Sequence, residues 1–143
     1  MIEFIKLLFL SKIILLTPVP INIDSQIDMD IKEPISAING GAHLEINIAS
    51  MIHENNVDAI TVKKIIDSKY SIDSISATLI NEKTSKNIKL SYKGGISWGG
   101  KKDIRLILTP NENIGTNIEY NQISIKTNKP LIDVSVYWKN FSK

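Results

Sequence analysis

Apolar and polar residues alternate with a period of two along most of this chain. Between residues 21 and 32, isoleucine or methionine occupies every odd-numbered position except Ser25, and polar residues occupy every even-numbered position. Successive side chains of a β-strand point to opposite faces, so this pattern predicts a strand with one buried and one solvated face. Similar patterns predict further strands, and the full set is residues 21–32, 43–49, 60–66, 75–80, 88–92, 104–109, 120–127 and 131–138.

Short strands at this spacing predict an all-β domain. The fold class that they favour is a single antiparallel β-sandwich of about eight strands, immunoglobulin-like or jelly-roll in outline. Residues 57–67 also have a second interpretation, as a short helix. Three prolines fall between predicted strands, where a missing N–H removes no ladder hydrogen bond: Pro34, Pro110 and Pro130. The predicted core includes Leu44, Ile46, Ile48, Leu106, Leu108, Ile123, Ile125, Val134, Val136 and Trp138.

The first 20 residues have a different pattern, because apolar residues follow one another almost without interruption up to Leu16. The run is shorter than the roughly 20 apolar residues that a membrane-spanning helix needs, and it ends at Pro18. It resembles a signal peptide in length, although Lys12 interrupts it and no Ala-x-Ala cleavage site follows. We therefore expect a periplasmic or secreted β-domain at residues 21–143, with no stable membrane span. The alternative is a cytoplasmic protein in which this segment is a first strand or core helix.

Composition narrows the classes of function. The chain has 143 residues, no cysteine and a formal net charge of only +2. This length suits one domain, and the absence of cysteine excludes disulfides and thiolate metal sites. The small net charge gives no electrostatic reason to expect a nucleic-acid partner. No motif in the sequence indicates a cofactor or a metal ion.

One glycine-rich segment resembles a phosphate-binding loop. Residues 95–101 fit the spacing G-x-x-x-x-G-K, but Lys102 follows where serine or threonine would hold magnesium, and strands are predicted on both sides. A hairpin loop is the better interpretation. Trp98 lies between two glycine pairs in it, and an exposed indole offers a large contact area. The alternative is that this indole caps the core. The candidate binding residues are Trp98, Lys101, Lys102 and Tyr92.

A catalytic site has less support. His43 and Glu45 fall on the predicted outward face of their strand, and His53 lies beyond its end. This spacing matches no recognised zinc or acid–base motif, so we expect a solvated surface there. No G-x-S-x-G motif surrounds any serine. The sequence therefore predicts a protein that is not an enzyme.

The function that fits these observations is an exported, non-catalytic binding or surface-assembly protein with a protein or glycan partner. The strand at residues 21–32 is either the first strand of its own domain or a strand donated to a neighbouring subunit by β-strand addition. A carbohydrate-binding module or adhesin that uses loop aromatics is one alternative. A small hydrolase with a surface site formed by His43, Glu45 and His53 is the second.

Overall fold

The computed structural model describes residues 12–38, 40–54, 58–100, 102–116 and 118–140. It is an all-β fold with one α-helix, which confirms the predicted class. The strands are β1 (Lys12–Leu15), β2 (Ile21–Ile23), β3 (Gln26–Ile35), β4 (His43–Asn47), β5 (Ile75–Ile80), β6 (Asn87–Trp98), β7 (Ile104–Pro110), β8 (Tyr120–Thr127) and β9 (Leu131–Asn140). The helical elements are the 3-10 turn η1 (Ala49–Met51) and the α-helix α2 (Ala59–Ser68).

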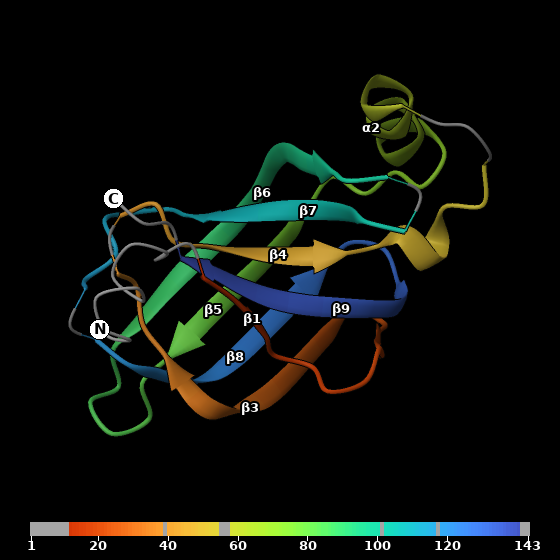
Figure 1. Ribbon diagram of the computed structural model, residues 1–143. Helices are drawn as coiled ribbons and strands as arrows, with labels where there is room; N and C mark the ends of the chain where they lie inside the picture. Colours follow the sequence, from red (N-terminus) through yellow and green to blue (C-terminus); the bar gives the residue numbers. More distant parts are fainter. Residues whose placement is uncertain (1–11, 39, 55–57, 101, 117, 141–143) are drawn as a thin grey trace, which may run out of the picture.

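The strands form one antiparallel sheet that curls into a half-barrel. Its order is β1-β9-β4-β7-β6-β5-β8-β3, and β2 also pairs with β9. Figure 1 shows β7, β4 and β9 as a front layer, with β6, β5 and β8 crossing behind it at an angle. The two halves of this curled sheet therefore occupy the place of the two layers of a sandwich, and the core lies between them.

The predicted strand at residues 21–32 is divided in two. β2 pairs with β9, whereas β3 pairs with β8 at the opposite end of the sheet order. The break falls at Asp24 and Ser25. The predicted faces are nevertheless correct, because Ile23 and Ile31 are buried on the core side. This segment pairs within its own chain, and it connects the two ends of the curled sheet.

The ten residues that the sequence analysis named as core are confirmed as core. All ten predicted core residues, from Leu44 to Trp138, are almost completely buried. Trp138 is the largest of them, and its indole Nε1 donates a hydrogen bond of 3.1 Å to the carbonyl of Ser36. The indole is therefore packed in the core, and its N–H donor has a hydrogen-bond acceptor.

Residues 60–66 form part of α2, so the predicted strand there is wrong and the helical alternative is right. Asp58 is the N-cap, and its Oδ1 accepts a 2.8 Å hydrogen bond from the backbone N–H of Thr61. Val62 and Ile66, one helical turn apart, are the buried residues of the helix. The segment forms a helix and not a strand because it has this N-cap and because residues four positions apart bury the same face of the helix.

The sheet includes residues that the sequence assigned to the signal-like segment. β1 pairs with the end of β9, and the N–H of Leu16 donates to the carbonyl of Val136 at 2.8 Å. Thr17 is buried, and its Oγ1 accepts a hydrogen bond from the N–H of Val136 at 3.1 Å. Among the described residues, no helix has the length and apolar character needed to cross a membrane.

Candidate functional site

The second half of β6 is partly exposed on its core face. β6 is longer than the predicted strand at residues 88–92, because it continues to Trp98. β5 pairs only with its first half, from Asn87 to Ser91. Beyond a bulge that follows Tyr92, Ile96 and Trp98 lie opposite the buried residues Leu106 and Ile104 of β7. The side chains of Ile96 and Trp98 therefore face the core side of the sheet, where no further strand among the described residues covers them.

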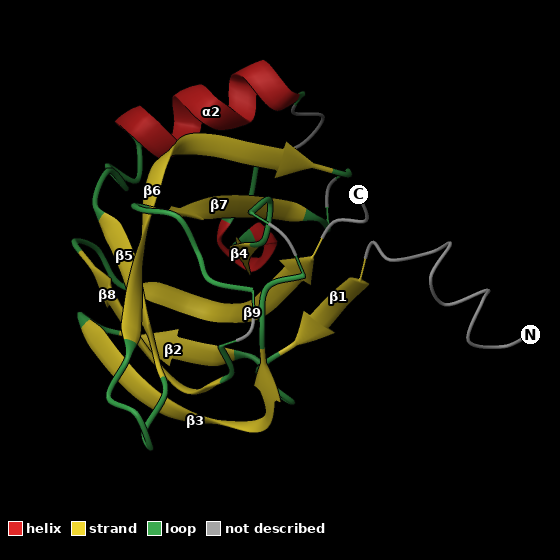
Figure 2. Cartoon of the chain, turned by 90° about the vertical axis from the view of Figure 1, so that its left-hand side faces the viewer, coloured by secondary structure: helices red, strands yellow, loops and turns green. Residues whose placement is uncertain are grey.

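α2 lies against this part of β6, as Figure 2 shows. A cavity of about 440 Å³ separates the two elements, and its lining residues are Ala59, Ile60, Lys63, Lys64, Gly94 and Ile96. Ile60 is 71% exposed, although it is a large aliphatic residue. We call this surface, extended along β6 to Trp98, the α2–β6 surface. Trp98 is two residues beyond Ile96 on the same face, about 7 Å along the strand.

Lys63 and Gly94 both line this cavity and lie next to each other. The ammonium group of Lys63 bonds both carboxylate oxygens of Asp67, at 2.7 and 2.6 Å, and this hydrogen bonding raises the pKa of Lys63. The end of its side chain also lies over Gly94, where an added Cβ would be 3.7 Å from the ammonium nitrogen. Gly94 has a φ of 92°, a conformation that residues with a Cβ rarely adopt. Glycine thus gives β6 its bulge beneath the lysine.

Tyr92 lies below the surface and not on it. Its side chain is buried, and burial raises the pKa of its phenol. Its hydroxyl has no hydrogen-bond partner among the described residues, although the nearby ammonium group of Lys63 lowers the same pKa in part. Tyr92 was one of the predicted binding residues, and in this buried position it offers little contact area to a partner.

The other predicted binding residues lie at or near the end of β6. Trp98 is 42% exposed, and it belongs to the strand β6 instead of the expected loop. Lys102 is exposed in the turn that leads to β7. Lys101 lies outside the described residues. The segment that matched the spacing of a phosphate-binding loop begins within β6, which continues to Trp98, and the N–H of Gly99 donates a 2.7 Å hydrogen bond to the carbonyl of Asp103.

The expectation of a solvated surface at His43 and Glu45 is wrong. Glu45 is only 2% exposed, and His43 is also buried. Their side chains meet at 2.7 Å between His43 Nε2 and Glu45 Oε2. They do point to the face opposite the core, as the alternation predicted. They are buried because β4 lies between β9 and β7, whose long side chains cover them.

Four further residues complete this cluster around Glu45. Arg105 of β7 donates to Glu45 Oε1 at 3.1 Å, and the ammonium nitrogen of Lys139 is 3.9 Å from Oε2. Arg105 also donates to Asp103 at 2.6 Å, and its guanidinium stacks 4.1 Å from the centre of the Tyr137 ring. Burial raises the pKa of Glu45, but the hydrogen bonds from His43 and Arg105 outweigh it, and the pKa lies below its ordinary value. The cluster therefore holds an ionised carboxylate.

The three residues of the predicted hydrolase site do not converge. His43 begins β4, whereas His53 is exposed beyond the other end of that strand and beyond η1. The pair formed by His43 and Glu45 is buried, so it offers no open surface to a substrate. Within the described part of the chain, no three or more side chains of the kinds that bind metals are placed to hold an ion.

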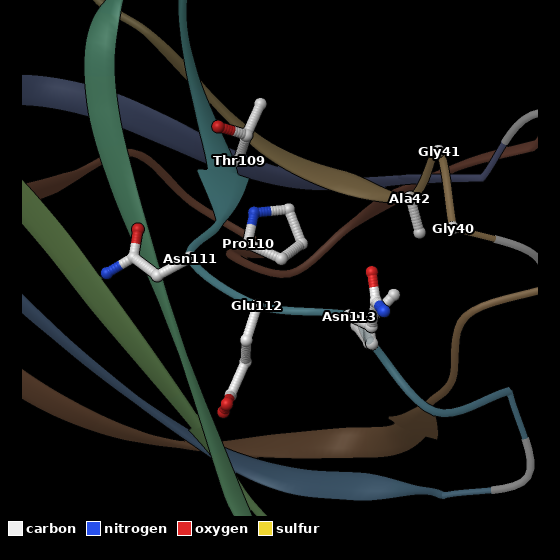
Figure 3. Close-up of a pocket in the computed structure, with 9 residues that line it drawn as sticks. Gly40, Gly41, Ala42, Thr109, Pro110, Asn111, Glu112 and Asn113 are labelled. Atoms are coloured by element: carbon white, nitrogen blue, oxygen red, sulfur yellow. The ribbon is translucent and has the colours of Figure 1, made fainter.

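A larger cavity, of about 510 Å³, opens at the end of the sheet next to the start of β4 (Figure 3). It is lined by two segments, residues 40–42 and 109–114, and neither His43 nor Glu45 contributes to it. The side chains of Asn111 and Glu112 extend in different directions, so they do not form a converging set of polar groups. Glu112 is the only charged residue in the lining. This cavity has no arrangement that would select a ligand.

Comparisons with known proteins give no relative for this chain. No family model, curated protein or solved structure matches it. Its function is therefore inferred from its own residues. Sequence reasoning found Trp98 and Lys102 but missed Ile60, Lys63 and Lys64 as neighbours of β6. The N-cap sequence that begins at Asp58 was the available signal for the helix that places them there.

Proposed function

We propose that this chain is an exported, non-catalytic binding domain that holds a segment of a partner protein on the α2–β6 surface. The observation that carries the proposal is a stretch of core-facing strand, from Ile96 to Trp98, that the rest of the fold leaves partly uncovered. Ile60 of α2, a large and exposed aliphatic residue, lines the same cavity as Ile96. Exposed apolar surface next to polar residues is typical of protein interaction sites.

The charges around the cavity indicate the chemistry of the partner. Lys63 and Lys64 line it, and no carboxylate is among the lining residues. Asp67 already engages Lys63, so Lys64 and the exposed Lys102 are the cations most available to a partner. The partner segment should therefore carry an apolar side chain that enters between Ile60 and Ile96, together with acidic residues that meet these lysines.

A glycan is a weaker candidate for the same surface. Sugar binding by stacking uses several exposed aromatic rings in one plane, and Trp98 is the only aromatic residue among the large exposed hydrophobic residues of the described chain. Tyr92 is buried below the surface. The geometry thus favours a polypeptide partner over a glycan.

Export is part of the proposal and is supported by the apolar N-terminal run that ends at Pro18. Cleavage between Thr17 and Ser25 would remove β1 and leave β9 paired on one side only, with β4, along the stretch that β1 now covers. The α2–β6 surface lies on other strands and does not depend on β1. The binding proposal therefore applies to the chain in either form.

A displayed library of random twelve-residue peptides, selected on the full chain, tests the binding proposal. Selected peptides should share an apolar residue flanked by acidic residues. Their affinity should fall at least about tenfold on Ile60→Ser and on Trp98→Ala, because each change removes contact area at the surface. The thermal unfolding midpoint should stay nearly the same, since both side chains are exposed.

Ile132→Ser is the matched control, because Ile132 is an exposed isoleucine on β9, away from α2 and β6. It should leave peptide affinity unchanged. The proposal fails if selected peptides have no acidic preference, or if Ile60→Ser and Ile132→Ser bind them equally well. A large loss of stability on Trp98→Ala would show that this indole is structural, and the surface would then end at Ile96.

A further inference from the structure

One edge of β6 is open along the second half of the strand. β5 pairs with β6 only from Asn87 to Ser91, and beyond Ser91 no described strand pairs with that edge. β7 pairs with the opposite edge of β6 as far as Trp98. Figure 2 shows this part of β6 extending past the start of β5, below α2. The row of the sheet that β5 occupies therefore holds no described strand beside the last residues of β6.

Hydrogen bonds around β7 show which backbone groups of β6 point to this open edge. The N–H of Gly99 donates to the carbonyl of Asp103, so these two residues form a hydrogen-bonded pair. Such pairs alternate with non-bonded ones in an antiparallel ladder, and the next pair, Trp98 with Ile104, is therefore non-bonded. The carbonyl of Ile104 indeed accepts from the residue that follows β4. The backbone N–H and C=O groups of Ile96 and Trp98 thus point to the open edge.

The position of β5 gives an added segment a definite end. β5 and β6 are antiparallel, so a segment that joins the open edge in the antiparallel direction runs in the same row and the same direction as β5. It approaches the first residue of β5, Ile75. The segment cannot continue past that point, because β5 occupies the rest of the edge. The end that lies there is its C-terminal end.

Lysine side chains lie next to this end of the row. Lys63 and Lys64 of α2 line the cavity together with Gly94, which is closer to β5 than Ile96 is. The two acidic residues of α2 and its N-cap, Asp67 and Asp58, already accept hydrogen bonds from the helix. A carboxylate is therefore favoured at this end, and a positively charged amino group is disfavoured. The charges thus select the antiparallel direction, in which a C-terminus arrives beside the lysines.

We infer that the partner segment is a free C-terminal tail that joins the open edge of β6 by β-strand addition. The inference rests on the proposed function, in which the exported chain holds a segment of another protein on the α2–β6 surface. The main chain of the tail pairs with Ile96 and Trp98. Directly opposite residues of an antiparallel pair share a face, so the side chain opposite Ile96 enters the cavity toward Ile60. The terminal carboxylate, one or two residues further along, meets Lys64.

The other free edge strand that a second copy could offer after export, β3, does not fit this position. The N–H of Thr127 donates to the carbonyl of Ser25, so the even-numbered residues of β3 direct their backbone groups to its free edge. Against β6 these residues would place the carboxylates of Asp28 and Asp30 beside the indole of Trp98. The even-numbered residues from 26 to 32 are all polar, so no apolar side chain would enter the cavity.

Other segments of this chain are also unsuitable. A second copy of β6 would bring its own lysine-lined cavity to the same face of the joined strands, where like charges repel. Each described strand is followed by further residues, so none ends in a carboxylate beside Lys64. Residues 1–11 continue into β1 at their C-terminal end, and export removes them. The charges and the geometry therefore point to the C-terminal tail of another protein.

A short peptide with a free C-terminus provides the test with the full chain. The probe has seven residues that alternate serine with valine, and it is acetylated at its N-terminus. We expect saturable binding with a dissociation constant below about 1 mM, measured by NMR titration. The amide protons of Ile96 and Trp98 should exchange at least about tenfold more slowly in the complex, because each becomes hydrogen-bonded. Amidation of the C-terminus should weaken binding at least about tenfold, because a charge-assisted hydrogen bond is lost.

Lys64→Gln and Lys89→Gln form a matched pair of variants. Both lysines are exposed, but Lys64 lines the cavity, whereas Lys89 lies in the first half of β6, which β5 covers. Lys64→Gln should weaken binding of the free-acid peptide at least about fivefold and leave the affinity of the amidated peptide unchanged. Lys89→Gln should change neither affinity. The thermal unfolding midpoint should stay nearly the same in both variants.

Several results would overturn the inference. Absence of saturable binding is one, and equal affinity of the free-acid and amidated peptides is another. Unchanged exchange at Ile96 and Trp98 in a saturated complex would place the peptide elsewhere. Self-association of the chain that slows exchange at these two amides would assign the edge to a second copy. An increase in peptide affinity on Glu3→Gln would assign it to residues 1–11, whose single carboxylate side chain is Glu3.

Failure of this inference can be told apart from failure of the proposed function. Peptides that lose affinity on Ile60→Ser but bind equally well with an amidated C-terminus would keep the α2–β6 surface as a binding site and remove only the C-terminal tail. Peptides that bind Ile60→Ser and Ile132→Ser equally well would remove the proposed function itself.

Discussion

Replacing Glu45 with glutamine tests the most buried charge of the protein that the structure describes. Glutamine has nearly the same shape, so the substitution removes the charge and leaves the packing. The substitution removes the charge-assisted hydrogen bonds that the carboxylate forms with His43 at 2.7 Å and with Arg105 at 3.1 Å. The ammonium group of Lys139, at 3.9 Å, loses a weaker attraction.

The expected cost is about 2 kcal/mol. Hydrogen bonds to charged groups contribute roughly 1.5–3 kcal/mol each, and breaking a buried ion pair costs roughly 3–5 kcal/mol when it leaves a buried charge unpaired. Arg105 keeps its 2.6 Å bond to Asp103, so its charge is not left unpaired and the cost falls well below that upper range. Glutamine also keeps an oxygen that can accept from Arg105.

Stability should depend on pH in a defined direction. The pKa of Glu45 lies below its ordinary value in the folded protein, so its ionised form stabilises the fold. This contribution is complete above the pKa of the unfolded chain, and it is lost as the pH falls through the lower folded pKa. The charged and titratable groups that face the carboxylate are His43, Arg105 and Lys139. The advantage of wild type over Glu45→Gln should be largest above about pH 5 and should decrease below about pH 4.

Urea unfolding followed by circular dichroism measures the effect. With a slope near 2 kcal/mol per molar urea, the midpoint should fall by about 1 M at neutral pH. Asp103→Asn is the control, because the Asp103 side chain is partly exposed and its ion pair should contribute less than about 1 kcal/mol. A change below about 0.5 kcal/mol on Glu45→Gln, or a difference that grows as the pH falls, would refute the reasoning.

Two other predictions concern the core and the N-terminus. Val136→Asp should cost several kcal/mol, because it places an unpaired carboxylate in the core beside Ile46, and urea unfolding should show it; a cost like that of Ser135→Asp on the opposite face would contradict the fold. N-terminal sequencing of the native product should find a new N-terminus between Thr17 and Ser25, whereas intact Met1 on soluble cytoplasmic material would end the export proposal.

The period of two predicted the core because burial on one face of a strand is a local property of the sequence. The sequence predictions were wrong where the structure depended on pairing with residues far away in the chain. The alternation of residues 21–32 is interrupted only at Ser25, and there the chain leaves β9 after Ile23 and joins β8 at Gln26. Three consecutive polar residues, Asp24 to Gln26, mark the break, but they do not show that the two parts pair with different strands, because both parts keep the same buried face. At residues 60–66 the local signal existed, in the cap at Asp58, but the alternation of isoleucine obscured it.

The polar cluster shows the same limit for side chains. Alternation correctly placed His43 and Glu45 on the face opposite the core, and the usual inference from that face is exposure to solvent. Burial followed from the order of the sheet, which places β4 between β9 and β7. Arg105 and Tyr137 then cover the carboxylate from both sides. The position of β4 in the sheet depends on pairings with residues about 60 and 90 positions away, which a pattern within one strand cannot reveal.

Residues 12–17 fit two interpretations of the N-terminus, as part of a signal peptide and as a first strand. A run such as Ile13 to Leu16 suits the apolar region of a signal peptide, and it suits equally a strand with both faces apolar. Its partner in the fold is β9, the strand that carries Trp138 and Val136. Cleavage after Thr17 would therefore expose the edge of a core strand, and an uncleaved chain leaves the edge at β1 exposed instead. In both forms one strand edge at this end of the sheet has no partner strand among the described residues.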